Sequence, residues 1–307
     1  MNGAELGLFI ASSLRLAMPL LLAATGELVS EKAGVLNLSL EGMMLAGAFA
    51  AAIVSLASGS PISGLLAGVG ASLIVALAQA VLSITIRADQ LVVGIGFNIL
   101  ILGITTFLFR EIRGVGASDL IPGLPTWSIP GLASLPILGP ALFQHSSLFY
   151  VGLLLVVGTW ALLAYTSFGL SVAAVGEDPA AADKAGVDVS RTRYVAVLYA
   201  GAMAGVAGAF LSIADLDTFT EGMTKGAGYL ALASVIFGGW TGWRTALACL
   251  LFGVATALQF LLPNLGYSVP APLLLMLPYV MALLAVGGLV GNIRTPRALG
   301  VPFFRGH

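Results

Sequence analysis

The chain has 307 residues, of which 59% are hydrophobic and only 9% are charged. An ordinary soluble domain carries roughly 25% charged residues, so this chain cannot cover a water-facing surface. Its mean hydropathy of +1.03 and its apolar runs from end to end indicate a polytopic integral membrane protein. The net charge of −1 leaves no basic face for nucleic acid. The single cysteine excludes an intrachain disulfide, and the two distant histidines exclude a His-based metal site. We expect no removable signal peptide.

Apolar windows of about 20 residues, the length that spans a bilayer, predict an all-α fold with nine crossings. The window at 228–240 is short for a span and could be a half-helix or a re-entrant piece. The Pro- and Gly-rich segment 110–147 and the charged segment 166–193 are the expected extramembrane loops. The predicted crossings are 6–25, 37–57, 64–86, 89–109, 148–165, 194–214, 228–240, 244–262 and 273–291.

The basic residues predict the orientation of the chain, because cytoplasmic loops carry an excess of Lys and Arg. Three basic residues, Arg110, Arg113 and Lys225, fall on one side of the nine crossings. We therefore expect the other side to be cytoplasmic, with the N-terminus outside and the C-terminus inside. That side carries Lys32, Arg87, Lys184, Arg191, Arg193, Arg244, Arg294, Arg297 and Arg305.

Once oriented, the crossings divide into two inverted halves within a single membrane domain, 1–307. Residues 6–109 form the first four-helix repeat, 148–165 a linking helix, 166–193 a cytoplasmic loop and 194–291 the second repeat. Each half carries an Ala-Gly pair, Ala33-Gly34 and Ala227-Gly228, ahead of an apolar helix. Inverted halves of this kind are typical of transporters, although a chance division stays open.

Motifs for chemistry within the chain are scarce. No lysine follows a glycine-rich loop and precedes Ser or Thr, so we expect no ATP hydrolysis by this chain. Within the predicted crossings, ionisable residues are almost absent apart from Arg15 and Glu41. An ion-driven carrier needs buried coupling-ion ligands, and a membrane-embedded enzyme needs paired acid, base or metal ligands. The sequence predicts neither set.

The side chains that remain for a solute pathway are mainly neutral amides and aromatic rings. They suit an uncharged polar or ring-bearing solute through hydrogen bonds and stacking. Each one alone could equally be an interhelical hydrogen bond or a space filler, and Glu41 could cap a helix rather than act as a gate. The candidates are Asn37, Ser39, Glu41, Gln90, Phe97, Asn98, Phe237 and Trp240, with Gln79 and Gln259 as further amides.

The most specific pattern lies in the charged loop. It reads as a turn, a proline at a helix start, a short Ala-rich helix and a glycine stop. An exposed helix has no need of Ala on every face, so the small residues favour a helix lodged in a cleft of another protein; a solvated helix without a partner is the alternative. The residues concerned are Gly176, Glu177, Pro179, Ala181, Ala182, Ala185 and Gly186.

Five stretches make the sequence resemble the permease subunits of bacterial ABC importers for nucleosides and simple sugars, within the wider group of ribose and branched-chain amino-acid permeases. They are EKAGVLNLSLEGMM (31–44), RADQ (87–90), AVGEDPAAADKAGV (174–187), VIFGGW (235–240) and ALGVP (298–302). The resemblance covers nearly the whole chain.

The resemblance implies that 174–187 is the coupling helix that docks on a separate ATPase subunit, which binds ATP and Mg²⁺, while this chain binds no cofactor. It also implies a pore formed by two permease chains, often different ones, in the bacterial inner membrane, and an extracytoplasmic solute-binding protein. A nucleoside is the expected solute, with a simple sugar or riboflavin as alternatives. A self-sufficient secondary carrier remains the rival of another class.

Overall fold

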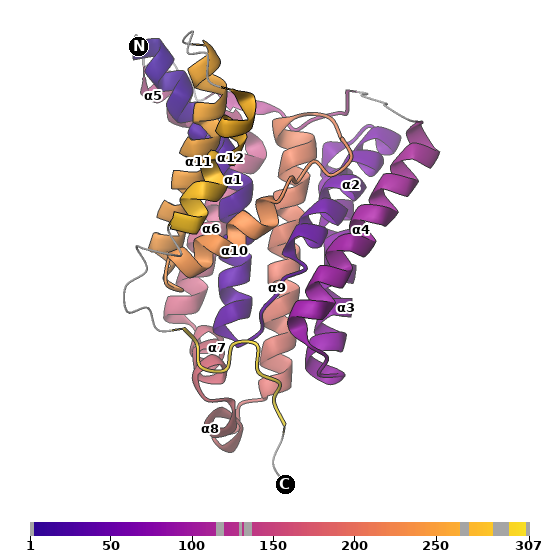
Figure 1. The fold of residues 1–307 in the computed structure, drawn as a ribbon, viewed down its shortest axis with the longest axis vertical. Coiled ribbons are helices and arrows are strands. Elements are labelled where there is room, and N and C mark those ends of the chain that lie inside the picture. The colour runs from indigo at the N-terminus through magenta and orange to yellow at the C-terminus, as the bar shows by residue number, and fades with distance from the viewer. Residues whose placement is uncertain are drawn as a thin grey trace.

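The computed structural model describes residues 3–114, 120–128, 131, 137–264, 270–284 and 295–304. These residues are almost entirely helical, as predicted, and the long helices stand roughly parallel in one bundle (Figure 1). The elements are α1 (Gly3–Lys32), α2 (Leu40–Ser58), α3 (Pro61–Ala80), the π-helix η1 (Val81–Thr85), α4 (Gln90–Arg113), β1 (Thr126–Ser128), α5 (Leu138–Phe143), β2 (Gln144–Ser146), α6 (Ser147–Tyr165), α7 (Ser167–Glu177), α8 (Pro179–Lys184), α9 (Val189–Phe210), the π-helix η2 (Leu211–Asp215), α10 (Ala227–Phe237), α11 (Gly242–Asn264) and α12 (Ala271–Leu284).

Seven helices of the described residues are long and apolar enough to cross a membrane. The count of nine is not confirmed, because α10 and α12 are shorter apolar helices at the positions of the seventh and ninth predicted crossings. For α10 the structure agrees with the expectation of a half-helix. Residues 285–291 of the last predicted crossing, and Arg294 and Arg305 of the charge count, lie outside the described residues.

Glycines let α3 pack closely against both α2 and α9, as small residues do at membrane helix interfaces. A Cβ on Gly68 would lie 2.7 Å from the carbonyl oxygen of Gly47 on α2, and one on Gly201 would lie 2.3 Å from Cβ of Ala76 on α3. No larger residue fits at either point without a shift of the backbones. The GxxxG spacings at 64–68 and 201–205 therefore serve helix packing.

The first helix is longer than the sequence predicted. It continues past residue 25 to Lys32 and ends where Gly34 takes a left-handed φ of +85°. This extension buries Glu27 and Glu31 completely, both at 0% exposure. The expectation that ionisable residues are almost absent from the crossings was therefore wrong, because it depended on an α1 that ended seven residues too early.

The two expected loops contain secondary structure. In 110–147, the described part includes the last turn of α4, the helix α5 and an antiparallel pair in which Trp127 faces His145. In 166–193, α7 and α8 are separate helices, and α8 begins at Pro179 with Asp178 as its N-cap, whose carboxylate accepts a hydrogen bond from the N–H of Ala181. Gly186 has a φ of +89°, which confirms the glycine stop.

Candidate functional site

Two helices begin beside each other inside the bundle, far from either end of α1 (Figure 1). One is α2, which starts at Leu40, and the other is α10, which starts at Ala227. The two starts are in contact: a Cβ on Gly228 would lie 2.5 Å from the backbone nitrogen of Glu41. Helix N-termini carry partial positive charge from unpaired N–H groups, so this meeting point requires an acceptor.

The carboxylate of Glu41 supplies that acceptor for α10. One oxygen accepts hydrogen bonds from the hydroxyl of Thr224 at 2.5 Å and from the N–H of Gly226 at 2.8 Å; the other accepts from the N–H of Gly228 at 2.7 Å. Glu41 therefore caps a helix, but the helix is α10 and not its own α2. The residue is only partly buried, so the cap also faces accessible space.

Asn98 of α4 supplies the corresponding hydrogen-bond acceptor for the start of α2. Its side-chain oxygen accepts a hydrogen bond from the N–H of Gly42 at 2.8 Å, while its amide nitrogen donates to the carbonyl of Leu38 and to the hydroxyl of Tyr229, each at 2.8 Å. A single amide thus ties α4 to the start of α2 and to α10. Phe97, its neighbour on α4, is half-buried.

The stretch 33–39, which we call the connector, leads from the end of α1 to this meeting point and is held by side chains from other elements. The side-chain oxygen of Gln90 accepts a hydrogen bond from the N–H of Leu36 at 2.8 Å, and Glu27 accepts one from the N–H of Asn37 at 3.1 Å. Ser39 donates to the side chain of Asn37 at 2.7 Å. Asn37 and Ser39 are fully buried, so in this conformation they hold the connector and present no surface to a solute.

Trp240 lies three residues after the end of α10 and is paired with a glutamate that sequence reasoning missed. Its indole N–H donates to Glu31 at 2.5 Å, and the residue is 7% exposed. Phe237, one turn earlier, is half-buried. The Ala33-Gly34 pair was the available signal for Glu31, because a helix that ends there carries Glu27 and Glu31 on one face, four residues apart.

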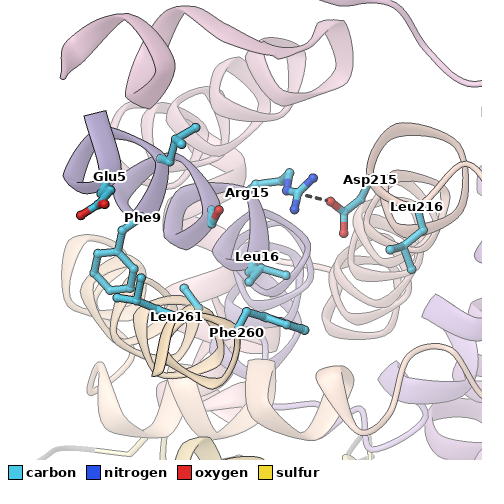
Figure 2. A pocket seen from close by; sticks show the side chains of 11 residues that line it. Glu5, Phe9, Arg15, Leu16, Asp215, Leu216, Phe260 and Leu261 are labelled. Carbon is cyan, nitrogen blue, oxygen red and sulfur yellow. Dashed lines mark ion pairs between the residues drawn. The ribbon is translucent and has the colours of Figure 1, made fainter. Parts of the chain in front are cut away.

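A cavity of about 490 Å³ lies between α1, the end of η2 and α11 (Figure 2). Figure 2 shows Arg15 of α1 and Asp215 of η2 pointing toward one another across it, with Nε of Arg15 3.1 Å from a carboxylate oxygen of Asp215. The sequence singled out Arg15 but not its partner. The cavity is lined by Glu5, Leu8, Phe9, Ser12, Arg15, Leu16, Asp215, Leu216, Ala257, Phe260 and Leu261.

At the opposite end of the bundle, α8 projects from the other helices (Figure 1). Ala181, Ala185, Gly186 and Glu177 are exposed there, and Pro179 is half-buried. Ala182 is different: it is buried at 4% exposure in a cluster with Val175 and Val189. The sequence predicted that the Ala residues on every face of this helix lie in a cleft of another protein. That prediction needs correction for the face of Ala182, because this face packs on the chain itself.

The segment 295–304, which we call the tail, lies across the same end and joins three elements. The N–H of Ala298 donates to the carbonyl of Gly176 at 2.9 Å, and the N–H of Gly300 donates to that of Gly34 at 3.1 Å. Arg193, 2% exposed, donates to the carbonyl of Val301 at 3.0 Å and to that of Ala33 at 3.2 Å. The 174–187 stretch, the tail and the connector therefore form one hydrogen-bonded unit.

These observations define a class of protein: a multi-pass helical membrane protein in which helices start inside the bundle. The sequence profile described as branched-chain amino acid transport system / permease component matches residues 9–286. The chain belongs to this family.

Curated relatives point the same way. The chain is 38% identical to the guanosine ABC transporter permease protein NupQ of Bacillus subtilis, over 98% of both chains. It is 30% identical to the nucleoside ABC transporter permease protein NupC of Lactococcus lactis, again over 98% of both. It is 39% identical to the putative glucose ABC transporter permease protein TsgC13 of Haloferax volcanii, over 81% of this chain and 75% of that one. No solved structure matches. The chain is thus a non-catalytic permease subunit of an ABC transporter.

Proposed function

We propose that this chain is one of two permease subunits of an ABC importer for nucleosides. The observation that carries the proposal is similarity over 98% of the chain to two permeases named for guanosine and for nucleosides. The neutral and aromatic side chains predicted for the pathway agree with an uncharged, ring-bearing solute. A glucose importer is the second candidate, because the similarity to the putative glucose permease is equally strong over a shorter part of the chain.

The energy for transport comes from a separate ATPase subunit, which binds ATP and Mg²⁺ and docks on α8. The exposed small residues Ala181 and Ala185 support this assignment, because a packed groove tolerates added volume poorly. The second permease is a different chain, and an extracytoplasmic binding protein delivers the solute. The complex lies in the bacterial inner membrane, with α8 in the cytoplasm and the N-terminus outside.

Within the membrane, we assign the solute pathway to the surroundings of the meeting point between α2 and α10. Glu41 is partly exposed, and the half-buried rings of Phe97 and Phe237 belong to the two helices, α4 and α10, that adjoin it. Asn98 and Gln90 hold the backbone that surrounds the pathway. The other predicted residues act indirectly. Asn37 and Ser39 hold the connector, and Trp240 holds the segment after α10.

The test is uptake by the assembled complex. Proteoliposomes that contain both permeases and the ATPase, with ATP inside and the binding protein outside, should accumulate labelled guanosine and not labelled glucose. The binding protein should show the same preference as a rise in its melting temperature. Accumulation of glucose alone would replace the nucleoside assignment with the sugar one, and guanosine uptake without the ATPase would contradict the ABC mechanism.

A further inference from the structure

The cavity of Figure 2 is lined by the first half of α1 and the last part of α11, and the N-terminus of α1 lies at the end of the bundle opposite α8 (Figure 1). The cavity volume of about 490 Å³ falls within the range of small-molecule sites, roughly 300–1,000 Å³. None of the pathway residues predicted from the sequence is among those that line it. The cavity is thus separate from the meeting point of α2 and α10.

A buried carboxylate faces this cavity with hydrogen-bonding capacity to spare. The side chain of Asp215 is 5% exposed, and that of Arg15 is 49% exposed. Although Nε of Arg15 lies 3.1 Å away, Oδ1 of Asp215 accepts no hydrogen bond. A carboxylate oxygen has more than one lone pair, so Oδ1 of Asp215 can accept a hydrogen bond from a ligand hydroxyl or N–H while it faces Arg15. Asp215 also ends the π-helix η2, and π-helical turns are frequent at functional sites.

The charges around the cavity select the class of ligand. The charged side chains among the lining residues are the carboxylates of Glu5 and Asp215 and the guanidinium of Arg15. The guanidinium is already paired with Asp215, so the lining residues offer a phosphate no unpaired cation and place a carboxylate beside it. Nucleotides and anionic lipid headgroups are therefore disfavoured, and a neutral ligand with donor groups fits.

The remaining walls are apolar and include two aromatic rings, Phe9 from α1 and Phe260 from α11, both visible in Figure 2. Such rings offer faces or edges to a flat heterocycle. The hydroxyl of Ser12 adds one neutral donor and acceptor. A nucleoside with its base against the two rings and its sugar toward Asp215 would contact both the apolar and the polar parts of the cavity wall.

We propose that this cavity is a binding site for a neutral nucleoside, with the base against Phe9 and Phe260 and the ribose hydroxyls donating to Asp215. The inference rests on the proposed nucleoside function. It adds the position of a binding site and its selectivity: the site accepts nucleosides and rejects nucleotides. Carboxylates bind ribose hydroxyls in this way at dinucleotide sites.

The experiment measures direct binding of labelled guanosine to the assembled permease and ATPase complex without the binding protein, whose own affinity would mask the effect. Phe260→Ala should raise the Kd about tenfold, as the loss of one ring contact does. Phe107→Ala on α4 is the matched control, since Phe107 is 66% exposed against 62% for Phe260 and lies outside the cavity; its Kd should equal that of the unmodified complex. Guanosine monophosphate should compete poorly.

Asp215→Asn should weaken guanosine binding as well, with Glu221→Gln as its control, because Glu221 forms an ion pair with Arg110 away from the cavity. If Asp215→Asn does not assemble, Phe260→Ala decides. An unchanged Kd in Phe260→Ala, no guanosine binding by a complex that transports guanosine, or a phospholipid found by native mass spectrometry that guanosine does not displace would each overturn the site and leave the proposed function standing. A complex that takes up no nucleoside would overturn both.

Discussion

The carboxylate of Glu41 accepts a hydrogen bond from the backbone N–H of Gly228, 187 positions further along the chain. This contact joins the first turn of α2 to the first turn of α10, where N–H groups of both helices have no partner within their own helix. Membrane proteins tolerate such interrupted helices only where other groups satisfy the freed backbone. Glu41 does so for α10, and Asn98 does so for α2.

Removal of the Glu41 carboxylate should therefore destabilise the protein. Glu41→Ala leaves the N–H groups of Gly226 and Gly228 without their acceptor, which costs about 1–3 kcal/mol for each buried group. Glu41→Gln keeps one acceptor oxygen and should lose less. The melting temperature in detergent should be highest for the unmodified protein, lower for Glu41→Gln and lowest for Glu41→Ala. An Ala variant as stable as the original would show that water satisfies the start of α10.

The pairing of Trp240 with Glu31 should be visible as energetic coupling between the two residues. Trp240→Phe removes the indole N–H and leaves the buried Glu31 without its donor, and Glu31→Gln replaces the carboxyl acceptor by an amide. The double variant should cost less than the sum of the single ones, with a coupling of about 0.5–3 kcal/mol. Chemical denaturation of the unmodified protein, the two single variants and the double variant measures this coupling energy. Strictly additive losses of stability would show that the two side chains do not interact.

The two faces of α8 should respond differently to the same substitution. Ala181→Trp alters the exposed face, so the membrane domain should stay folded while co-purification of the ATPase and uptake are lost. Ala182→Trp forces an indole among Val175 and Val189 and should lower the melting temperature of the isolated chain, because overpacking costs about 1–3 kcal/mol. Leu120→Trp, at a residue that is 85% exposed, is the control. Normal assembly of Ala181→Trp would exclude this face as the ATPase contact.

Arg193 should hold the tail in place. Arg193→Met keeps a long apolar side chain but removes the donors to Ala33 and Val301, so we expect the tail to detach and trypsin to cleave after Arg297 several-fold faster. Arg191→Met is the matched control, since Arg191 is exposed two residues away. Equal cleavage rates in the two variants would show that the backbone hydrogen bonds of Ala298 and Gly300 suffice.

The orientation of the chain can be tested by thiol labelling. The single native cysteine, Cys249, is fully buried, so it should contribute little background. In intact cells, an impermeant thiol reagent should label Leu120→Cys from outside and leave Asp188→Cys unlabelled until the membrane is opened. The reverse pattern would invert the topology.

The sequence by itself was sufficient for the membrane class, the helical fold and the family, because these depend on apolar length and on local motifs. The start of α8 at Pro179 and its glycine stop at Gly186 were also predictable, since capping and turn residues act over a few positions. The end of α1 was marked by Ala33-Gly34, but hydropathy alone placed it too early, and Glu27 and Glu31 were missed with it.

Only the tertiary structure decided which polar residues meet. Glu41 lies in the first turn of α2, where a local rule assigns it to its own helix, yet its carboxylate caps α10. The sequence left open whether Trp240 faces a solute or forms an interhelical hydrogen bond; in the structure its indole donates to Glu31. Ala182 packs on its own chain. Asp215 forms an ion pair with Arg15, which lies 200 positions earlier in the sequence. Hydropathy and spacing describe neighbours along the chain, whereas these partners are chosen by the packing of separate helices.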